Sequence, residues 1–350
     1  MKKALLTIIL ISIISFICLK ESISQESGMS VYKIWDQAKH NGFPDLIRFK
    51  NAFYCSFREG NNHCDNTNTG RVRIVRSEDG KNWESVALFE LKGTEMREAH
   101  LSETPEGRIM VAVGAGYFFN NHFNTLATYV SFSDKSGFNF SSLEKTVVDP
   151  QITTSREWIW RVTWNKGIGY GIMYQIHVGK NPDPWEAFLV KTTDGKYYEK
   201  LAKIELDGDP NESTIRFDRN DNMYILIRRD KEDRMGFIAE SPYPYRELTY
   251  NRLKVQLGGP NFQFLNKRQL VIGTRSYEKS GSSTAILMTD LKGNVLKTTK
   301  LPSGGDTSYP GMVIHRKKLW VAYYSSHEGK SNIYMGVIFF KDMGVKQKQK

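Results

Sequence analysis

A short motif recurs along the chain and limits its possible folds more than any other feature. It reads Ser/Thr-x-Asp-Gly-x-x-aromatic and occurs at residues 77–83 and 192–198, with a degenerate copy at 133–140. In such a turn the Asp side chain accepts backbone hydrogen bonds, the Gly supplies a positive φ, and the aromatic ring packs under the hairpin. The three aspartates lie roughly 55 to 60 residues apart, so the motif indicates a repeated structural hairpin rather than a catalytic group.

Short runs rich in β-branched and aromatic residues fill the rest of the chain, and helical periodicity is nearly absent. We expect antiparallel strands at 45–49, 52–57, 71–75, 108–113, 223–227 and 319–324. A repeat of about 40 to 50 residues with four strands is typical of a β-propeller blade. The length then predicts about six blades. The expected fold is therefore all-β: a six-bladed β-propeller with four-stranded antiparallel blades, in a single domain over residues 25–345.

The N-terminus has the pattern of a secretory signal peptide. Two lysines precede an apolar stretch at residues 4–18, which is too short to span a membrane. Cleavage after the small-x-small site at 22–24 would make residues 1–24 the signal, whereas a lipoprotein-type signal would place a lipid on Cys18. We therefore expect a secreted or periplasmic protein, with attachment to the outer membrane and the cell surface through a lipid anchor as the alternative.

Composition excludes several classes of protein. The 350 residues are 40% hydrophobic and 25% charged, which rules out a disordered, collagenous or multi-span membrane chain. The net charge of +11 favours anionic partners in general, but only the tail at 346–350 forms a basic run, so we predict no nucleic-acid partner. An extracytoplasmic compartment permits a disulfide between Cys55 and Cys64, which the sequence does not decide.

Several segments resemble the sialidase superfamily, whose Asp-boxes match the repeated turn. Residues 43–47 and 57–60 look like the first blade of bacterial sialidases. Asn211-Glu212-Ser213, followed by Arg228-Arg229, resembles the segment that carries the catalytic glutamate and the second carboxylate-binding arginine. The chain also looks similar to secreted bacterial proteins labelled exo-α-sialidase-like, which share the Phe-Arg-Glu-Gly and Ser-Gly-Gly-Asp-Thr-Ser-Tyr signatures.

The later segments continue this resemblance. Arg275 resembles the third arginine of the family, and Tyr309 sits where the family places its nucleophilic tyrosine. The first arginine is missing, because Gly42 stands in its place. Arg48, Arg58 or Arg97 could substitute for it from another position. The general acid of the family is expected in the loop after residue 60, where His63 and Asp65 are both candidates.

The chemistry of a sialidase explains why these residue types matter. An anionic nucleophile is repelled by the carboxylate of a sialic acid, whereas a neutral Tyr is not, and it becomes nucleophilic when a carboxylate takes its proton. The resemblance assigns these roles to Tyr309 and Glu212. Planar guanidinium groups suit the substrate carboxylate, so Arg275 is expected to act with either Arg228 or Arg229. Neighbouring residues in a strand face opposite sides, and we favour Arg228.

The resemblance implies an exo-acting, retaining glycoside hydrolase that removes a terminal, acidic, sialic-acid-like sugar from a glycan. Arg161, on the opposite strand face from Trp158 and Trp160, joins Arg58 and Arg97 among the substrate-binding candidates. Two alternatives remain: a propeller that binds glycans without cleaving them, and a polysaccharide lyase acting on uronate-containing glycans. We expect no metal and no cofactor, because the seven His are dispersed and no phosphate-binding Gly loop occurs.

Overall fold

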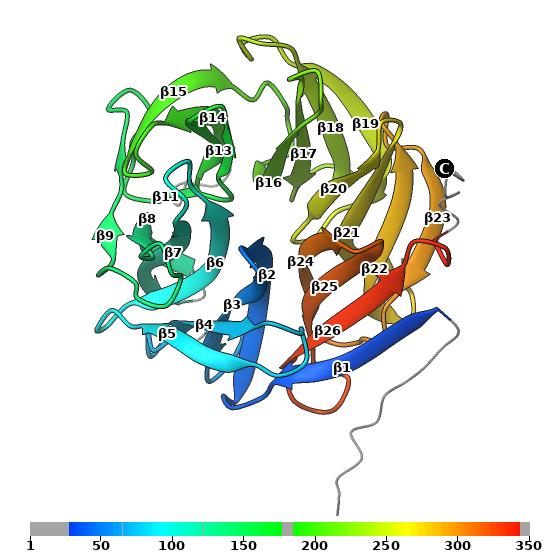
Figure 1. Ribbon diagram of the computed structural model, residues 1–350. Helices are drawn as coiled ribbons and strands as arrows, with labels where there is room; N and C mark the ends of the chain where they lie inside the picture. Colours follow the sequence, from blue (N-terminus) through cyan, green and yellow to red (C-terminus); the bar gives the residue numbers. More distant parts are fainter. Residues whose placement is uncertain (1–27, 65, 121, 177–184, 344–350) are drawn as a thin grey trace, which may run out of the picture.

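The computed structural model describes residues 28–343, except 65, 121 and 177–184. Its elements are all strands, which form six sheets arranged as blades around a central axis (Figure 1). The predicted six-bladed β-propeller is therefore confirmed. The expected signal segment 1–24 lies outside the described residues, and within the described part no helix is long and apolar enough to cross a membrane.

In five blades, four antiparallel strands follow one another from the axis outward. Blades 1 and 2 contain β2 (His40–Phe49), β3 (Ala52–Gly60), β4 (Arg71–Ser77) and β5 (Glu84–Phe89), then β6 (Glu95–Glu103), β7 (Ile109–Phe119), β8 (His122–Phe132) and β9 (Glu144–Lys145). Blades 4 and 5 contain β16 (Pro210–Phe217), β17 (Met223–Arg229), β18 (Met235–Ser241) and β19 (Thr249–Gln256), then β20 (Asn261–Asn266), β21 (Gln269–Glu278), β22 (Gly281–Asp290) and β23 (Val295–Lys300).

Blade 3 departs from the expected four-strand pattern. Its innermost strand is split into β11 (Glu157–Ile159) and β12 (Thr163–Asn165), which both pair with β13 (Ile168–Gln175). β14 (Glu186–Thr192) and β15 (Tyr197–Lys203) follow, and β10 (Val147–Val148) adds a short parallel pairing at the outer edge.

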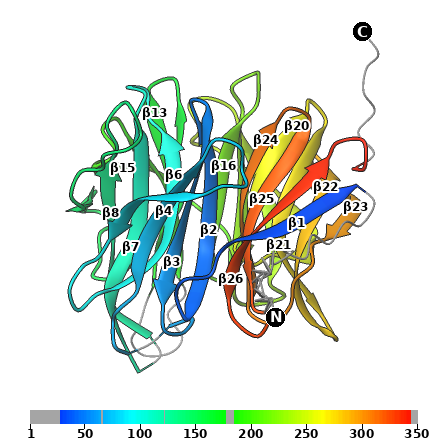
Figure 2. The same ribbon diagram turned by 60° about the horizontal axis from the view of Figure 1, so that its bottom comes forward.

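Blade 6 closes the ring by joining both ends of the domain. β24 (Thr307–His315), β25 (Lys318–Ser325) and β26 (Asn332–Phe339) come from the end of the chain. The outermost strand is β1 (Met29–Trp35), which pairs antiparallel with β26, for example Val31 with Gly336. Figure 2 shows β1 lying along β26. The first strand is thus hydrogen-bonded to the last, and separating them would require the ring to open.

The middle strands are buried on both faces because each blade packs against two neighbours. In β17 six of seven residues are buried, and β25 is buried from its second residue to its last. Such strands appear in the sequence as unbroken apolar runs rather than as an alternation, which is the pattern that predicted 223–227 and 319–324.

The repeated turn has the expected hydrogen bonds. Asp79 accepts from the backbone N–H groups of Lys81 and Asn82 at 2.8 and 2.9 Å, and Gly80 has a φ of 76°. Asp194 does the same in blade 3, where Gly195 has a φ of 74°. These turns connect the two outer strands of their blades and contribute no side chain to the axis.

The innermost strands carry the feature that positions a site. Four of them have an irregularity in their antiparallel pairing near their first residues. The shifts lie between Gly42 and Asp45, Met96 and Ala99, Pro210 and Ser213, and Ser308 and Gly311. A bulge takes residues out of the ladder and re-aims their side chains. Because the first strand of a blade begins where the antiparallel second strand ends, these bulges and the ends of the second strands share one end of the ring.

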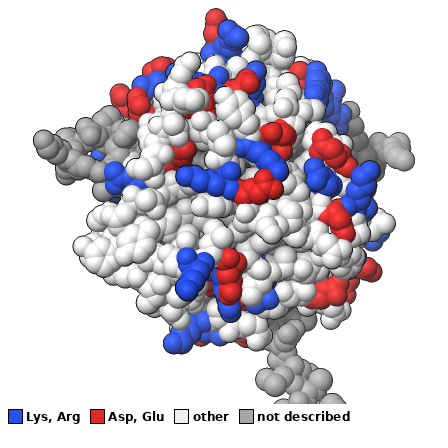
Figure 3. Space-filling model, turned by 90° about the vertical axis from the view of Figure 1, so that its left-hand side faces the viewer, with Lys and Arg blue, Asp and Glu red and all other residues white. Residues whose placement is uncertain are grey.

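Charged residues on the outer surface form mixed pairs. On the face seen in Figure 3, basic and acidic side chains are interspersed. In this part of the molecule, Lys191 lies 3.0 Å from Glu199, and Lys196 lies 2.6 Å from Glu144. The positive net charge is therefore not gathered into one basic patch on this face.

The contact between blades 1 and 6 gives a first prediction. A Cβ at Gly311 would lie 2.7 Å from Asp45 Cα and would also meet the backbone nitrogen of Leu46. We expect Gly311→Ala to lower the free energy of unfolding by about 1–3 kcal/mol, as overpacking does. Gly304→Ala is the control, since its Cβ would meet only His327 at 3.7 Å. Thermal and urea unfolding would measure both, and equal stability of the two variants would contradict this close packing.

Candidate active site

Tyr309 and Glu212 come from two of the bulges and meet near the axis. The Tyr309 hydroxyl donates a hydrogen bond of 2.6 Å to Glu212 Oε1. Tyr309 has a φ of 51° and Ser308 one of 112°, so the backbone here is in the left-handed region that non-glycine residues seldom adopt. This conformation turns the Tyr309 ring out of the β24 ladder toward the carboxylate of β16.

The electrostatics of this pair keep the proton on the tyrosine. Burial raises the pKa of Tyr309 well above its ordinary value, and the negative charge of Glu212 raises it further. Burial also raises the pKa of Glu212, while the nearby Arg228 opposes that rise. The resting pair is therefore a neutral hydroxyl hydrogen-bonded to a carboxylate that is less acidic than usual, an arrangement suited to proton transfer from Tyr309 to Glu212.

Arg228 and Arg229 face opposite sides of the end of β17. Arg228 forms an ion pair with Glu212 Oε2 and a second one of 2.6 Å with Asp230, and its Nη1 lies 3.4 Å from the Tyr309 hydroxyl. Arg229 turns away and donates a 3.0 Å hydrogen bond to the carbonyl of Met235. Of these two arginines, Arg228 is therefore the one that lies beside Tyr309 and Glu212.

Arg275, near the end of β21, borders the same pair. Its Nε donates to the Thr307 carbonyl at 2.8 Å, and its Nη2 donates to the Tyr324 hydroxyl at 3.1 Å. Its Cζ lies 5.8 Å from the centre of the Tyr309 ring. The structure therefore brings Tyr309, Glu212, Arg228 and Arg275 together, although they are distant in sequence.

Phe43 follows Gly42, the residue that aligns with the missing first-blade arginine, and its ring is buried beside Tyr309. The backbone φ of Phe43 is 57°. Its buried ring packs edge-on against the ring of Tyr309, with ring centres 5.1 Å apart. The guanidinium of Arg97 lies 4.4 Å from the centre of the Phe43 ring. A side chain at residue 42 would have to displace the His40 ring, because a Cβ on Gly42 would lie 2.7 Å from His40 Cε1. Arg97 is thus the proposed substitute arginine that reaches this region.

Arg97 is held by the second bulge and by the loop after β3. It pairs with Glu98 at 2.9 Å, donates to the His63 carbonyl at 3.0 Å, and contacts the Cys64 sulfur. Cys55 and Cys64 are both free thiols. The Arg97 side chain therefore connects the bulge of β6 to the loop that carries His63.

The remaining arginine candidates lie away from the pair. Arg58 is fully buried and its guanidinium forms an ion pair of 2.5 Å with Glu95, which is also fully buried. Arg161 is buried beside Asp45, 2.5 Å from its Oδ1. Arg48 lies near the other end of β2, over the Phe53 ring. Arg58 and Arg161 are buried in ion pairs that join different blades, and neither contacts Tyr309 or Glu212, so their role is structural.

The two tryptophans expected on one face of residues 157–161 are also core residues. Trp158 and Trp160 are 5% and 1% exposed, and their ring centres lie 5.2 Å apart. Trp160 supports the Tyr309 ring from 6.1 Å. They are therefore not sugar-stacking platforms on the surface.

His63 belongs to a cluster that the sequence analysis did not assemble. Its Nδ1 lies 2.8 Å from Asp306 Oδ2, and His40 Nε2 lies 2.9 Å from the same oxygen. The Tyr324 hydroxyl donates to Asp306 Oδ1 at 2.7 Å. Burial opposes ionisation of Asp306, but hydrogen bonds from His40 and His63 hold its pKa below the usual range. Asp65, the other candidate acid, lies outside the described residues.

Sequence reasoning missed Phe43, Asp306 and His40 as members of the site, whereas the segment 323–329, which contains Tyr324, was a candidate for the border of the cleft. Asp306 stood inside the Ser-Gly-Gly-Asp-Thr-Ser-Tyr signature, and this was the only signal for it. His40 begins β2 and Tyr324 is the last residue but one of β25, and nothing in their local sequence indicates that both contact Asp306.

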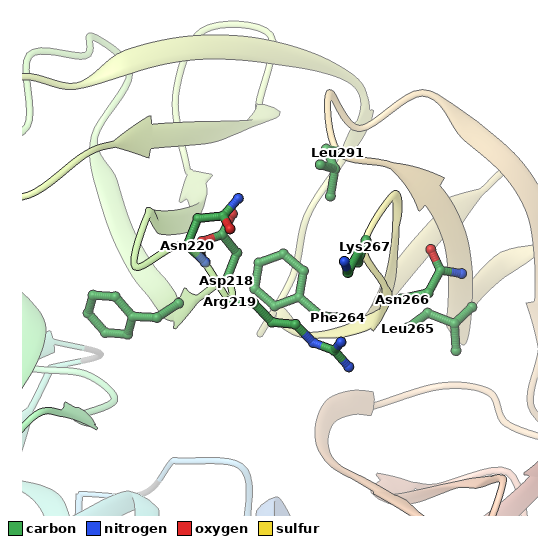
Figure 4. Close-up of a pocket in the computed structure, with 9 residues that line it drawn as sticks. Asp218, Arg219, Asn220, Phe264, Leu265, Asn266, Lys267 and Leu291 are labelled. Atoms are coloured by element: carbon green, nitrogen blue, oxygen red, sulfur yellow. Dashed lines mark hydrogen bonds between the residues drawn. The ribbon is translucent and has the colours of Figure 1, made fainter.

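Figure 4 shows a different hollow, of about 400 Å³, between the turns that follow β16 and β20. Asp218, Arg219 and Asn220 line one side, and residues 264–267 line the other. It lies at the opposite end of β16 from Glu212, and none of the candidate catalytic residues borders it. The candidate site is therefore the cluster around Tyr309.

Comparisons with known proteins address the fold. No protein-family model matches the chain, and no curated protein matches its sequence. Among solved structures, a protein of unknown function from Dyadobacter fermentans superimposes with a TM-score of 0.77 at 17% identity, covering 90% of this chain and 100% of that one. Its architecture is therefore shared over the whole domain.

Two enzymes have the same architecture. The Trypanosoma rangeli sialidase in complex with the inhibitor DANA gives a TM-score of 0.67 at 11% identity over 92% of this chain, which spans only 58% of the sialidase. The Penicillium chrysogenum alpha-L-arabinanase complexed with arabinobiose gives a TM-score of 0.66 at 12% identity, covering 91% of this chain and 99% of the arabinanase. The chain thus has the sialidase-like six-bladed propeller fold that its sequence resemblance predicted.

The buried ion pair under the site gives a second prediction. Arg58→Met would leave Glu95 as an uncompensated buried charge, and we expect a loss of about 3–5 kcal/mol in unfolding free energy. Arg252→Met is the matched control, since Arg252 pairs with Asp233 on the surface, where such a pair is worth about 0–1 kcal/mol. Denaturant unfolding of both variants would measure the difference, and a near-wild-type Arg58→Met would contradict the structural role.

Proposed function

We propose that this protein is an exo-acting glycoside hydrolase of sialidase-like type that cleaves a terminal acidic sugar from glycans. The observation that carries the proposal is the 2.6 Å hydrogen bond from Tyr309 to Glu212 at the axis of the propeller. The presence of glycoside hydrolases among proteins of the same fold supports the class of reaction.

In the proposed reaction Glu212 takes the phenolic proton as Tyr309 attacks the anomeric carbon. A bond forms between the Tyr309 oxygen and that carbon, the glycosidic bond breaks, and the leaving oxygen receives a proton from a general acid. Water then attacks the anomeric carbon and gives a proton to the conjugate base of the general acid, while the bond from that carbon to the Tyr309 oxygen breaks and Glu212 returns its proton to Tyr309. Two displacements at one carbon give net retention of configuration.

We infer that the substrate carries an anionic group, because cationic side chains line the site. Arg275 and Arg228 flank Tyr309, and Arg97 stands near the position of the missing first-blade arginine. A neutral tyrosine nucleophile avoids the repulsion that a carboxylate nucleophile would meet from such a substrate. The candidates for the general acid are His63 and Asp65.

Replacing Tyr309 by Phe tests the proposal. We expect Tyr309→Phe to lower sugar release by about 1,000-fold or more while binding is retained, because the nucleophilic oxygen is gone and the ring remains. Glu212→Gln should lose activity similarly, since the two residues act as a unit. Release from a panel of glycans ending in sialic or uronic acids, followed by mass spectrometry, would measure it.

Tyr224→Phe is the matched control. The Tyr224 hydroxyl donates a hydrogen bond of 2.8 Å to Glu240 on the adjacent strand. The substitution therefore removes a tyrosine–carboxylate hydrogen bond that lies outside the site. Binding without release by wild-type protein would establish the glycan-binding alternative instead. A product absorbing in the ultraviolet from uronate-containing glycans would establish a lyase and overturn the hydrolase.

A further inference from the structure

His40, His63 and Asp306 place three potential metal ligands at one point beside the candidate site. They come from the start of β2, the loop after β3 and the segment before β24. The ligand atoms His40 Nε2, His63 Nδ1 and Asp306 Oδ2 all lie within 4.8 Å of one another. No metal site was expected from the sequence, because its seven His are dispersed along the chain.

The distances between these atoms are hydrogen-bond distances that lie close to the spacing of ligand atoms around one ion. Metal–ligand bonds of about 2.1 Å at right angles separate neighbouring ligand atoms by about 3.0 Å, whereas a tetrahedral arrangement separates them by about 3.4 Å. The two nitrogen–oxygen distances here are 2.9 and 2.8 Å. Hydrogen bonds have these lengths without any ion, and small side-chain shifts would reach either geometry, so the types of ligand rather than these distances decide which ion fits.

The carboxylate is oriented so that one oxygen faces both imidazoles. Asp306 Oδ1 accepts a hydrogen bond from Tyr324 at 2.7 Å and lies 3.8 Å from Arg275. The backbone N–H of Asp306 donates to Ser326 Oγ at 2.9 Å. Such outer contacts hold a ligating carboxylate in place, and they leave Oδ2 directed at His40 and His63.

One side of the cluster is open. The side chain of His40 is only 9% exposed, whereas those of Asp306 and His63 are 30% and 46% exposed. His63 also packs edge-on against Phe43, with ring centres 4.8 Å apart, and Phe43 contacts Tyr309. An ion held here would keep coordination positions toward solvent next to the candidate cleft.

We propose that His40, His63 and Asp306 bind one divalent transition-metal ion of octahedral preference, such as Mn²⁺, Fe²⁺ or Co²⁺. Two imidazoles and one carboxylate with open positions are the ligand set that suits these ions. The open positions would take water or the oxygen atoms of an acidic sugar. With His63 Nδ1 as a ligand, His63 would not serve as the general acid of the proposed reaction. Ion binding itself does not depend on the proposed function.

Metal titration of the purified protein, stripped with a chelator, tests the proposal without any substrate. Co²⁺ and Mn²⁺ would be titrated by calorimetry, and Co²⁺ also by its visible absorption. We expect one ion per chain. Asp306→Asn and His63→Gln should each weaken binding by about 100-fold or more, since even outer contacts contribute about 10- to 100-fold. Tyr324→Phe should weaken it by about 10-fold.

His122→Gln is the control, since His122 is an exposed histidine whose Nδ1 contacts the Asn120 carbonyl away from the cluster. It should bind the ion like the wild type. Because His63 is exposed, His63→Gln should keep the wild-type melting temperature and remain informative if Asp306→Asn does not fold. No binding at millimolar ion, or equal binding by the His63 and His122 variants, would overturn the proposal and leave a hydrogen-bonded His–Asp–His cluster.

Discussion

The interruption of the β-ladder at the start of the innermost strands is the constraint on which the site depends. A regular strand would send alternate side chains into the two neighbouring blade interfaces. The bulges of β2, β6, β16 and β24 instead release Phe43, Arg97, Glu212 and Tyr309 toward one end of the ring. The positive φ values at Phe43 and Tyr309 are the backbone strain that accompanies this release, and the surrounding blades hold it in place.

Paired charges are the second constraint. A charge inside a propeller is tolerated only with a partner, and the structure shows such pairs around the axis: Arg58 with Glu95, Arg97 with Glu98, and Arg161 with Asp45. Arg228 compensates Glu212 in the same way. Arg275 donates hydrogen bonds to a carbonyl and a hydroxyl oxygen, and its nearest carboxylate, Asp306, is 3.8 Å away. Its charge is therefore less compensated than those of the other arginines, and it is better able to bind an anion.

The sequence predicted part of the site because the family order of residues survives in the chain. Glu212, Arg228, Arg275 and Tyr309 appear in that order, and the structure brings them together. Alternation along a strand also predicted that only one of Arg228 and Arg229 could face the pair. The prediction of substrate-binding arginines was less successful. An arginine in a buried ion pair, such as Arg58 with Glu95, cannot be told from a substrate-binding arginine by sequence alone.

By itself, the sequence determined the architecture: repeated Asp-Gly turns and short apolar runs require hairpins, and their number requires a ring of six blades. These signals are local, since a turn or a buried strand depends on neighbouring residues. The tertiary structure alone decided that Phe43 packs between Tyr309 and Arg97 and that His40, His63 and Asp306 converge. Both depend on how separate blades meet at the axis, and contacts between segments some 240 residues apart leave no local pattern in the chain.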